Sequence, residues 1–165
     1  MTLDDAVALS IAPSLPRVGL TDRLKAGDPT LLEMAARYRE DAAAAQARAA
    51  YSAMSVMAWN DPRFPPSLQV IPDVPPVLWF RGELGAFQAP AVAVVGSRAA
   101  SAVALETAER LGEELAAFGV TVISGLARGV DSAAHRGALK TGRTIAVLGS
   151  GLDCIYPGEH RALAG

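Results

Sequence analysis

The sequence predicts an α/β fold, with a parallel sheet in the second half and a smaller helical region before it. Three apolar runs, 91–95, 120–123 and 144–148, have the continuous apolar character of strands that are buried on both faces. The segments between them, 101–118 and 131–140, carry apolar residues at helical spacing. Because strand and helix alternate, we expect parallel strands joined by right-handed crossovers. The apolar face expected for the first of these helices consists of Leu105, Ala108, Leu111, Leu115 and Phe118.

The first 57 residues predict a bundle of short helices. Asp28 followed by Pro29 is a start signal, because aspartate caps a helix and proline loses no hydrogen bond at its first position. The alanine-rich segment 42–50 has high helix propensity but little bulk, so we expect it to pack thinly or lie exposed. Segment 15–19 has two interpretations, a hairpin turn that grips a DNA backbone or an ordinary turn between helices, and the second is favoured.

Residues 58–90 are rich in proline, which excludes a helix across most of this segment. Large apolar residues such as Trp59 and Phe64 stand between the prolines, which is not typical of a flexible linker. We therefore expect an extended connector that packs on the next domain, with a short strand at 77–80. The predicted domains are 1–57 (helical), 58–90 (connector) and 91–165 (sheet).

Composition excludes several classes of protein. The 165 residues are 51% hydrophobic and 19% charged, which is apolar enough to form a core and excludes wholesale disorder. The formal net charge of −2 excludes a globally basic nucleic-acid binder, although not a local basic pocket. The single Cys154 excludes a disulfide scaffold and a cysteine-cluster zinc site, and it suits the reducing cytoplasm, where we expect the protein to act. No apolar run approaches the roughly 18 to 20 residues of a membrane span.

Each of the three predicted strands ends in glycine with polar neighbours. In an open α/β sheet these carboxyl ends lie at one edge, where ligands bind. Glycine lets the backbone approach a ligand, and amides at helix N-termini attract anions, above all phosphate. Serine hydroxyls are further donors, and arginines offer bidentate contacts, so the sequence predicts a phosphate-lined pocket. Its candidate residues are Gly96, Ser97, Arg98, Ser124, Gly125, Arg128, Ser150 and Gly151.

Motifs for other phosphate sites and for catalysis are missing. Segment 96–101 is not the G-x-G-x-x-G of a dinucleotide site, and the sequence has no Walker loop or nucleophile elbow. Asp131 and His135, spaced i, i+4, form either an acid/base pair, half a metal site, or a structural pair in which Asp131 caps the helix and His135 anchors backbone. The structural interpretation is favoured, and we expect no catalytic residue, metal or cofactor. Cys154 has no evident partner and is expected to be a small core residue.

These motifs together resemble the DNA processing protein A family (DprA, also called Smf). The family pattern of an apolar strand followed by Gly-Ser/Thr-Arg is matched by 94–98. The longer pattern Ser-Gly-x-Ala-x-Gly-Ile-Asp-x-x-Ala-His-x-x-Ala-Leu is matched by 124–139, with valine in place of isoleucine. The specific resemblance covers residues 60–163 approximately. Further family patterns match 64–68, 75–82, 142–149 and 151–157.

The resemblance implies the first half of a Rossmann-like domain, preceded by a sterile-alpha-motif-like helical region. Members of the family bind single-stranded DNA during natural transformation, load the RecA recombinase onto it and act as dimers, without catalysis. By motif, the resemblance implies that 96–98, Ser124, Gly125 and Arg128 contact the DNA backbone. Contacts to phosphate give affinity without sequence preference, which suits competence-related recombination of imported DNA.

Three more basic residues and one aromatic residue have open interpretations. Arg136, Lys140 and Arg143 either extend a basic track for DNA or are solvated surface charges. Tyr156 is the candidate for base stacking near the predicted pocket.

The chain departs from the family pattern in two places. Ser101 and 103–104 stand where the family usually has threonine and an aromatic-glycine pair. The family's domain also continues past the equivalent of residue 165, with a Phe-x-x-Arg-Asn-Arg segment and the main dimer contact. We therefore expect this chain to be an incomplete domain that lacks that dimer contact.

Two alternative functions stay open. A nucleotide-processing enzyme related to the lysine-decarboxylase-like phosphoribohydrolases would use a Pro-Gly-Gly-x-Gly-Thr-x-x-Glu motif, which the sequence lacks. An inactive remnant of the DNA-binding protein would fold but bind little, because half of its site would be missing.

Overall fold

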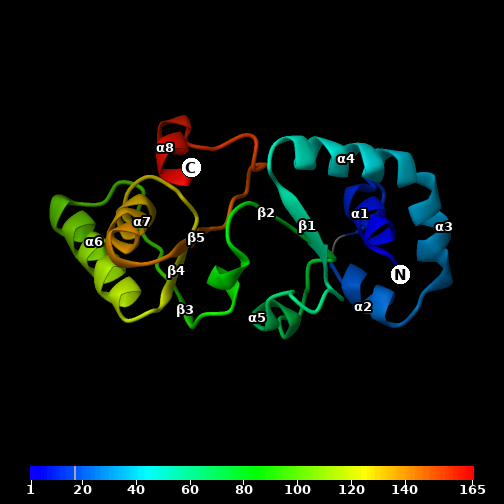
Figure 1. The fold of residues 1–165 in the computed structure, drawn as a ribbon, viewed down its shortest axis with the longest axis horizontal. Coiled ribbons are helices and arrows are strands. Elements are labelled where there is room, and N and C mark those ends of the chain that lie inside the picture. Colours follow the sequence, from blue (N-terminus) through cyan, green and yellow to red (C-terminus); the bar gives the residue numbers. More distant parts are fainter. Residues whose placement is uncertain (17) are drawn as a thin grey trace. The chain divides into compact units, whose positions relative to one another are not determined.

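The computed structural model describes residues 1–16 and 18–165, and it divides into two compact units (Figure 1). The first unit is Met1–Gly82 and the second is Glu83–Gly165. Among the described residues, no helix is both long enough and apolar enough to cross a membrane.

The first unit is a small helical bundle with a two-stranded sheet. Residues of α1 form the centre of its core, in contact with α3, α4 and both strands. Asp28 caps α3 as predicted, because its side chain accepts the amide of Thr30 at 3.0 Å. The elements are α1 (Leu3–Ile11), α2 (Leu20–Lys25), α3 (Pro29–Arg37), α4 (Arg39–Tyr51), β1 (Ser55–Ala58), α5 (Pro66–Gln69) and β2 (Val77–Phe80).

The boundary between the units lies after Gly82, and not at the predicted positions. The strand predicted at 77–80 is present as β2, but it pairs antiparallel with β1, from Ser55–Phe80 to Ala58–Val77. Ala58 and Val77 are buried in the same core as α1. Most of the predicted connector therefore belongs to the helical unit, because the pairing satisfies its backbone and the core covers its apolar side chains.

The contacts of segment 15–19 favour an ordinary turn between helices over a turn that grips DNA. Arg17 lies outside the described residues. Gly19 is in the left-handed region, with φ of 71°, and its amide donates to Asp73 Oδ1 at 2.9 Å. The Thr21 hydroxyl donates to the carbonyl of Val74. The amide of Gly19 is thus bound to a carboxylate of the same unit and is not open to a DNA phosphate.

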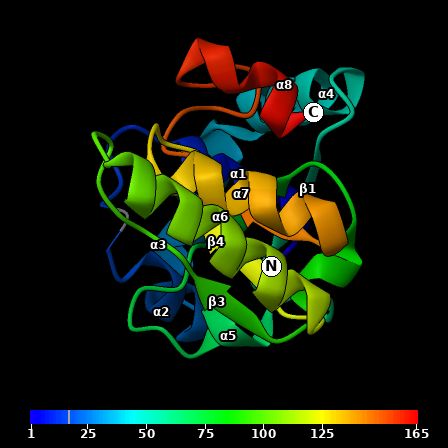
Figure 2. The same ribbon diagram turned by 90° about the vertical axis from the view of Figure 1, so that its left-hand side faces the viewer.

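The second unit contains the predicted parallel sheet, in the order β3-β4-β5. The fold class is therefore confirmed. Helices α6 and α7 lie side by side and both contact β4 (Figure 2). The segment before β3 also belongs here, because Thr121 donates its amide to Pro90 at 2.7 Å and its hydroxyl to Ala86 at 3.2 Å. The elements are η1 (Leu84–Phe87), β3 (Ala91–Ala93), α6 (Ala102–Ala117), β4 (Thr121–Ser124), α7 (Val130–Thr141), β5 (Thr144–Ala146), η2 (Gly158–His160) and α8 (Arg161–Ala164).

The predicted apolar face of α6 is wrong in part, because the helix packs through small residues. Phe118, which follows the helix, is 85% exposed, and Leu111 is exposed too. A Cβ atom on Gly112 would overlap the carbonyl of Ala134, and one on Gly137 would overlap the carbonyl of Glu109. The two helices therefore approach too closely for large side chains at their contact. The buried residues of α6 are Ala108, Gly112 and Ala116.

Burial of the strands also differs from the prediction that all three are buried on both faces. Only β4, the central strand, is largely buried, whereas β3 is exposed throughout and β5 is half-buried. The reason is position, because β3 and β5 are the two edges of this three-stranded sheet.

Candidate functional site

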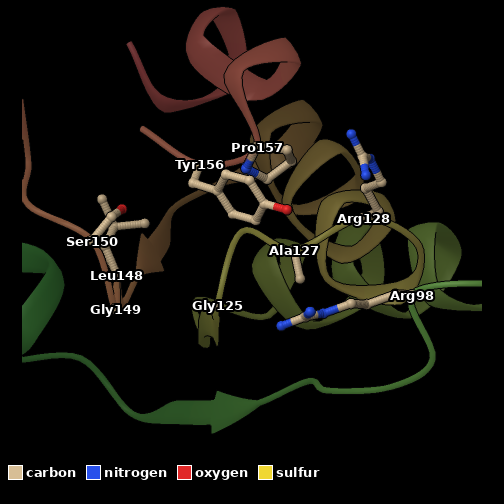
Figure 3. Close-up of a pocket in the computed structure, with 9 residues that line it drawn as sticks. All are labelled: Arg98, Gly125, Ala127, Arg128, Leu148, Gly149, Ser150, Tyr156 and Pro157. Carbon is tan, nitrogen blue, oxygen red and sulfur yellow. The ribbon is translucent and has the colours of Figure 1, made fainter. Parts of the chain in front are cut away.

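The carboxyl ends of the three strands meet around one pocket of about 350 Å³ in the second unit (Figure 3). The corner after β3 supplies Arg98, the corner after β4 supplies a loop that ends in Arg128, and the corner after β5 supplies Ser150. A turn with a cis Tyr156–Pro157 peptide forms the remaining wall. The lining residues are Arg98, Gly125, Ala127, Arg128, Leu148, Gly149, Ser150, Tyr156 and Pro157.

The two arginines of the pocket differ in what they contact. Arg128 forms a bidentate ion pair with Glu159, from Nε to Oε1 at 2.8 Å and from Nη2 to Oε2 at 2.9 Å. This hydrogen bonding raises the pKa of Arg128 and lowers the pKa of Glu159. Arg98 is exposed, has no hydrogen bond or ion pair to any described residue, and extends toward Gly125 (Figure 3). Arg98 is therefore the cation that is open to an incoming anion.

The loop from Gly125 to Arg128 is held by side chains from two other elements. Asp131 of α7 accepts the amides of Gly125 at 3.1 Å and of Ala127 at 3.4 Å through Oδ2. His160 donates from Nδ1 to the carbonyl of Leu126 at 2.8 Å, since a carbonyl can only accept. Leu126 is buried and has a φ of 59°, a left-handed conformation that these contacts stabilise. Asp131 thus has a structural role, but its carboxylate binds amides of the pocket loop rather than amides of its own helix.

His135 is a buried residue of the same helix and is only 1% exposed. Its Nδ1 lies 2.7 Å from Thr144 Oγ1, and that hydroxyl donates to the carbonyl of Val122 at 2.7 Å. The threonine proton is therefore committed to Val122, so Nδ1 of His135 is the donor. Desolvation lowers the pKa of His135 and so favours the neutral ring. The charge of Asp131 acts in the opposite direction, but its effect is smaller. Within the described part of the chain, no group of three His, Cys, Asp or Glu side chains is placed to hold a metal ion.

Half of the predicted phosphate contacts do not line the pocket. Ser124 is 3% exposed, and its hydroxyl donates to the carbonyl of Val94 at 2.6 Å, so it joins two strands instead. Gly96 lies against Val130, where a Cβ would come within 2.7 Å of the valine side chain. Ser97 accepts the amide of Ala99 at 3.1 Å. Gly151 lies beside Asp153, outside the pocket lining.

The corner at 96–98 is nonetheless fixed in place beside the pocket. The amide of Val130 donates to the carbonyl of Ser97 at 3.2 Å. Gly129 has a φ of 81°, and a Cβ there would overlap the same carbonyl. Only glycine permits this approach, which positions the backbone of Arg98 against the start of α7.

Comparisons with known proteins identify the family of the chain. The family model described as DNA recombination-mediator protein A matches residues 55–165. The chain belongs to this family.

Two curated relatives are similar to this chain over a part of their length. Protein Smf of Escherichia coli is 47% identical over 102 residues, which are 61% of this chain and 27% of that protein. DNA processing protein DprA of Streptococcus pneumoniae is 42% identical over 104 residues, which are 62% of this chain and 36% of that protein. The chain therefore spans about a quarter to a third of the length of these curated relatives.

Two solved structures resemble the fold. DprA from Streptococcus pneumoniae superposes with a TM-score of 0.75 and 27% identity, covering 99% of this chain and 63% of that one. DprA from Helicobacter pylori, whose structure describes a single-stranded DNA binding mode, has a TM-score of 0.59 and 29% identity, covering 67% and 50%.

The predicted basic track does not extend the pocket of this family member. Lys140 pairs with Glu109 at 2.7 Å and with Glu113 at 3.1 Å, and Arg136 lies 3.9 Å from Glu109. These hydrogen bonds raise the pKa of Lys140. Arg143 precedes β5, at the amino end of the strand, whereas the pocket lies at the carboxyl ends.

Some features of the site were missed or misjudged from the sequence. Glu159 was not a candidate, because its partner Arg128 lies far away in the sequence and no local pattern joins them. Tyr156 is mostly exposed in the pocket wall, and the Gly-Leu-Asp-x-x-Tyr-Pro pattern was the available signal for it. Cys154 is exposed, so its prediction as a core residue is wrong; it lies in a turn closed by its amide and the carbonyl of Gly151.

Proposed function

We propose that this chain binds the sugar-phosphate backbone of single-stranded DNA at the pocket on the carboxyl edge of its sheet, without catalysis. The observation that carries the proposal is an exposed Arg98 with no partner among the described residues, in a pocket bordered by three strand corners. A guanidinium binds phosphate in a bidentate way, and glycine corners let the strand approach the backbone. The described single-stranded DNA binding mode of the Helicobacter pylori relative supports the same ligand.

Within this proposal the lining residues have separate tasks. Arg98 is the main phosphate contact, and Gly149 and Ser150 offer amides and a hydroxyl beside it. The amide of Gly125 is bound by Asp131, so Gly125 contributes only the close approach of its backbone. Tyr156 presents an exposed ring on which an unpaired base can stack. A duplex does not expose the faces of its bases, so this arrangement favours single strands.

The wider role is part of the proposal. The chain spans only 27% and 36% of the two relatives above. We therefore propose the wider role for the whole protein: natural transformation, loading of the RecA recombinase, dimer formation and a cytoplasmic location.

Arg98→Gln tests the proposal by fluorescence anisotropy with a labelled single strand and the matching duplex. We expect the wild type to prefer the single strand and the variant to bind it about tenfold more weakly, roughly the loss of one charge-assisted contact. The slope of log affinity against log salt should also become less steep by about 0.7, the value for one phosphate contact.

Arg143→Gln is the matched control, because it removes the same charge from an exposed arginine at the opposite end of the strands. It should leave the affinity nearly unchanged. Equal losses in both variants would contradict the pocket and would indicate binding by net charge.

A further inference from the structure

Arg128 is already bound in the way that a phosphate would bind it. Its guanidinium contacts both carboxylate oxygens of Glu159, at 2.8 and 2.9 Å. A carboxylate and a phosphate present the same pair of acceptor oxygens to an arginine. One anion therefore excludes the other from this face of the guanidinium.

Both ends of this ion pair are anchored. Glu159 lies in η2, next to His160, whose ring holds the carbonyl of Leu126 and whose amide donates to Pro157 at 3.0 Å. Arg128 ends the loop whose amides are bound by Asp131. The fold thus positions the backbone of both residues, so that the carboxylate of Glu159 is within reach of Arg128.

The pair does not have the environment of a stabilising buried salt bridge. The side chains of Arg128 and Glu159 are 57% and 55% exposed, and exposed pairs contribute little to stability. Arg128 nevertheless lines the pocket, so the pair affects what the pocket can bind more than it affects folding.

We propose that Glu159 is an internal competitor for the anion, which occupies Arg128 until a phosphate displaces it. This inference rests on the proposed function. DNA then first meets Arg98, which is open, and engages Arg128 only after the Arg128–Glu159 pair has separated. The pair lowers the affinity of the pocket for DNA, so removal of the Glu159 carboxylate should raise that affinity.

Glu159→Gln tests the competition with the labelled single strand. We expect about two- to fivefold tighter binding, the range that corresponds to loss of an exposed ion pair. Thermal unfolding should be almost unchanged. Glu114→Gln is the matched control, because it removes the same charge of the same unit and frees Arg110 of α6 from its exposed pair.

The double variant Arg128→Gln with Glu159→Gln separates competition from simple charge. If Glu159 acts through Arg128, the double variant should bind as weakly as Arg128→Gln alone. Equal tightening by Glu159→Gln with and without Arg128, or by Glu114→Gln, would overturn the proposal, as would unchanged or weaker binding by Glu159→Gln.

A second measurement is independent of DNA and keeps the two proposals distinguishable. Inorganic phosphate is titrated while the Nε–Hε signal of Arg128 is followed by ¹⁵N NMR. The signal should move at a severalfold lower phosphate concentration in Glu159→Gln than in the wild type. Equal midpoints, or no movement in either protein, would overturn the competition. Failure of the wild type to bind DNA would instead overturn the proposed function.

Discussion

In the first unit the left-handed Gly19 donates its amide to Asp73, whereas in the second unit the guanidinium of Arg98 has no partner among the described residues. Both lie at a turn before a helix, and both are groups that attract anions. The difference is that the first unit supplies its own carboxylate. Potential to bind phosphate is therefore not enough to define a site, since the fold must also leave the donor open.

The two units also differ in how their cores are built. The first unit buries large side chains such as Leu9, Leu20 and Leu31, whereas the helix pair of the second unit meets through alanine and glycine. Large side chains leave cavities when they are shortened, and close helix contacts have no room for added atoms. The units should therefore respond to opposite kinds of substitution.

The largest effect is expected from Leu20→Ala in the first unit. Leu20 is fully buried, so we expect a loss of about 2–5 kcal/mol of stability from lost burial and a cavity. Val18→Ala, two residues earlier and well exposed, should change little. Urea unfolding measures the loss, and hydrogen exchange should locate it in α1 and α3. Equal acceleration of exchange in β4 and α7 would contradict the division into two units.

The next effect is expected from Gly137→Ala in the second unit. The added Cβ would overlap the carbonyl of Glu109, so α6 and α7 must separate, at a cost of about 1–3 kcal/mol. Gly85→Ala is the control, because among the described residues its Cβ would meet just the end of the Arg143 side chain, at 3.7 Å. Urea unfolding compares the two variants. A Gly137→Ala protein as stable as Gly85→Ala would mean that the helices are not in such close contact.

The fold could be predicted from the sequence in its order of elements but not in the packing of its helices. The order of strands and helices was predictable, because alternating apolar runs dictate a parallel sheet. The contact of α6 with α7 was not, because helical spacing singles out large apolar residues such as Phe118, while Gly112 and Gly137 make the contact.

The site was predictable to a similar degree. Glycine after each strand, with arginine after two of them, located the pocket edge, and Arg98, Gly125, Arg128 and Ser150 do line it. The sequence did not reveal that the Ser124 hydroxyl is committed to Val94, because that depends on the register of two strands. It also did not reveal Glu159, since a contact between distant segments has no periodic pattern.

The smallest effect is expected from acid, through His135. Burial lowers the pKa of the folded histidine below its ordinary value of 6.5, so the unfolded chain binds a proton more readily than the folded one. Stability should therefore fall as the pH drops from 7.5 through 6.5 toward the lower folded value. Urea unfolding at several pH values measures this loss, and His135→Gln should reduce it.

His160→Gln is the control for the same experiment, because it removes the other histidine of the chain while His135 keeps its buried position. Burial, the largest cause of the lowered pKa of His135, persists in His160→Gln, so this variant should still lose stability over this pH range. If His135→Gln lost as much stability on acidification as the wild type, the buried ring would not be the group that resists protonation. The acid sensitivity would then belong to another group that titrates in this range, because the carboxyl groups of the ion pairs at Glu109 and Glu159 have pKa values below their ordinary 4.5.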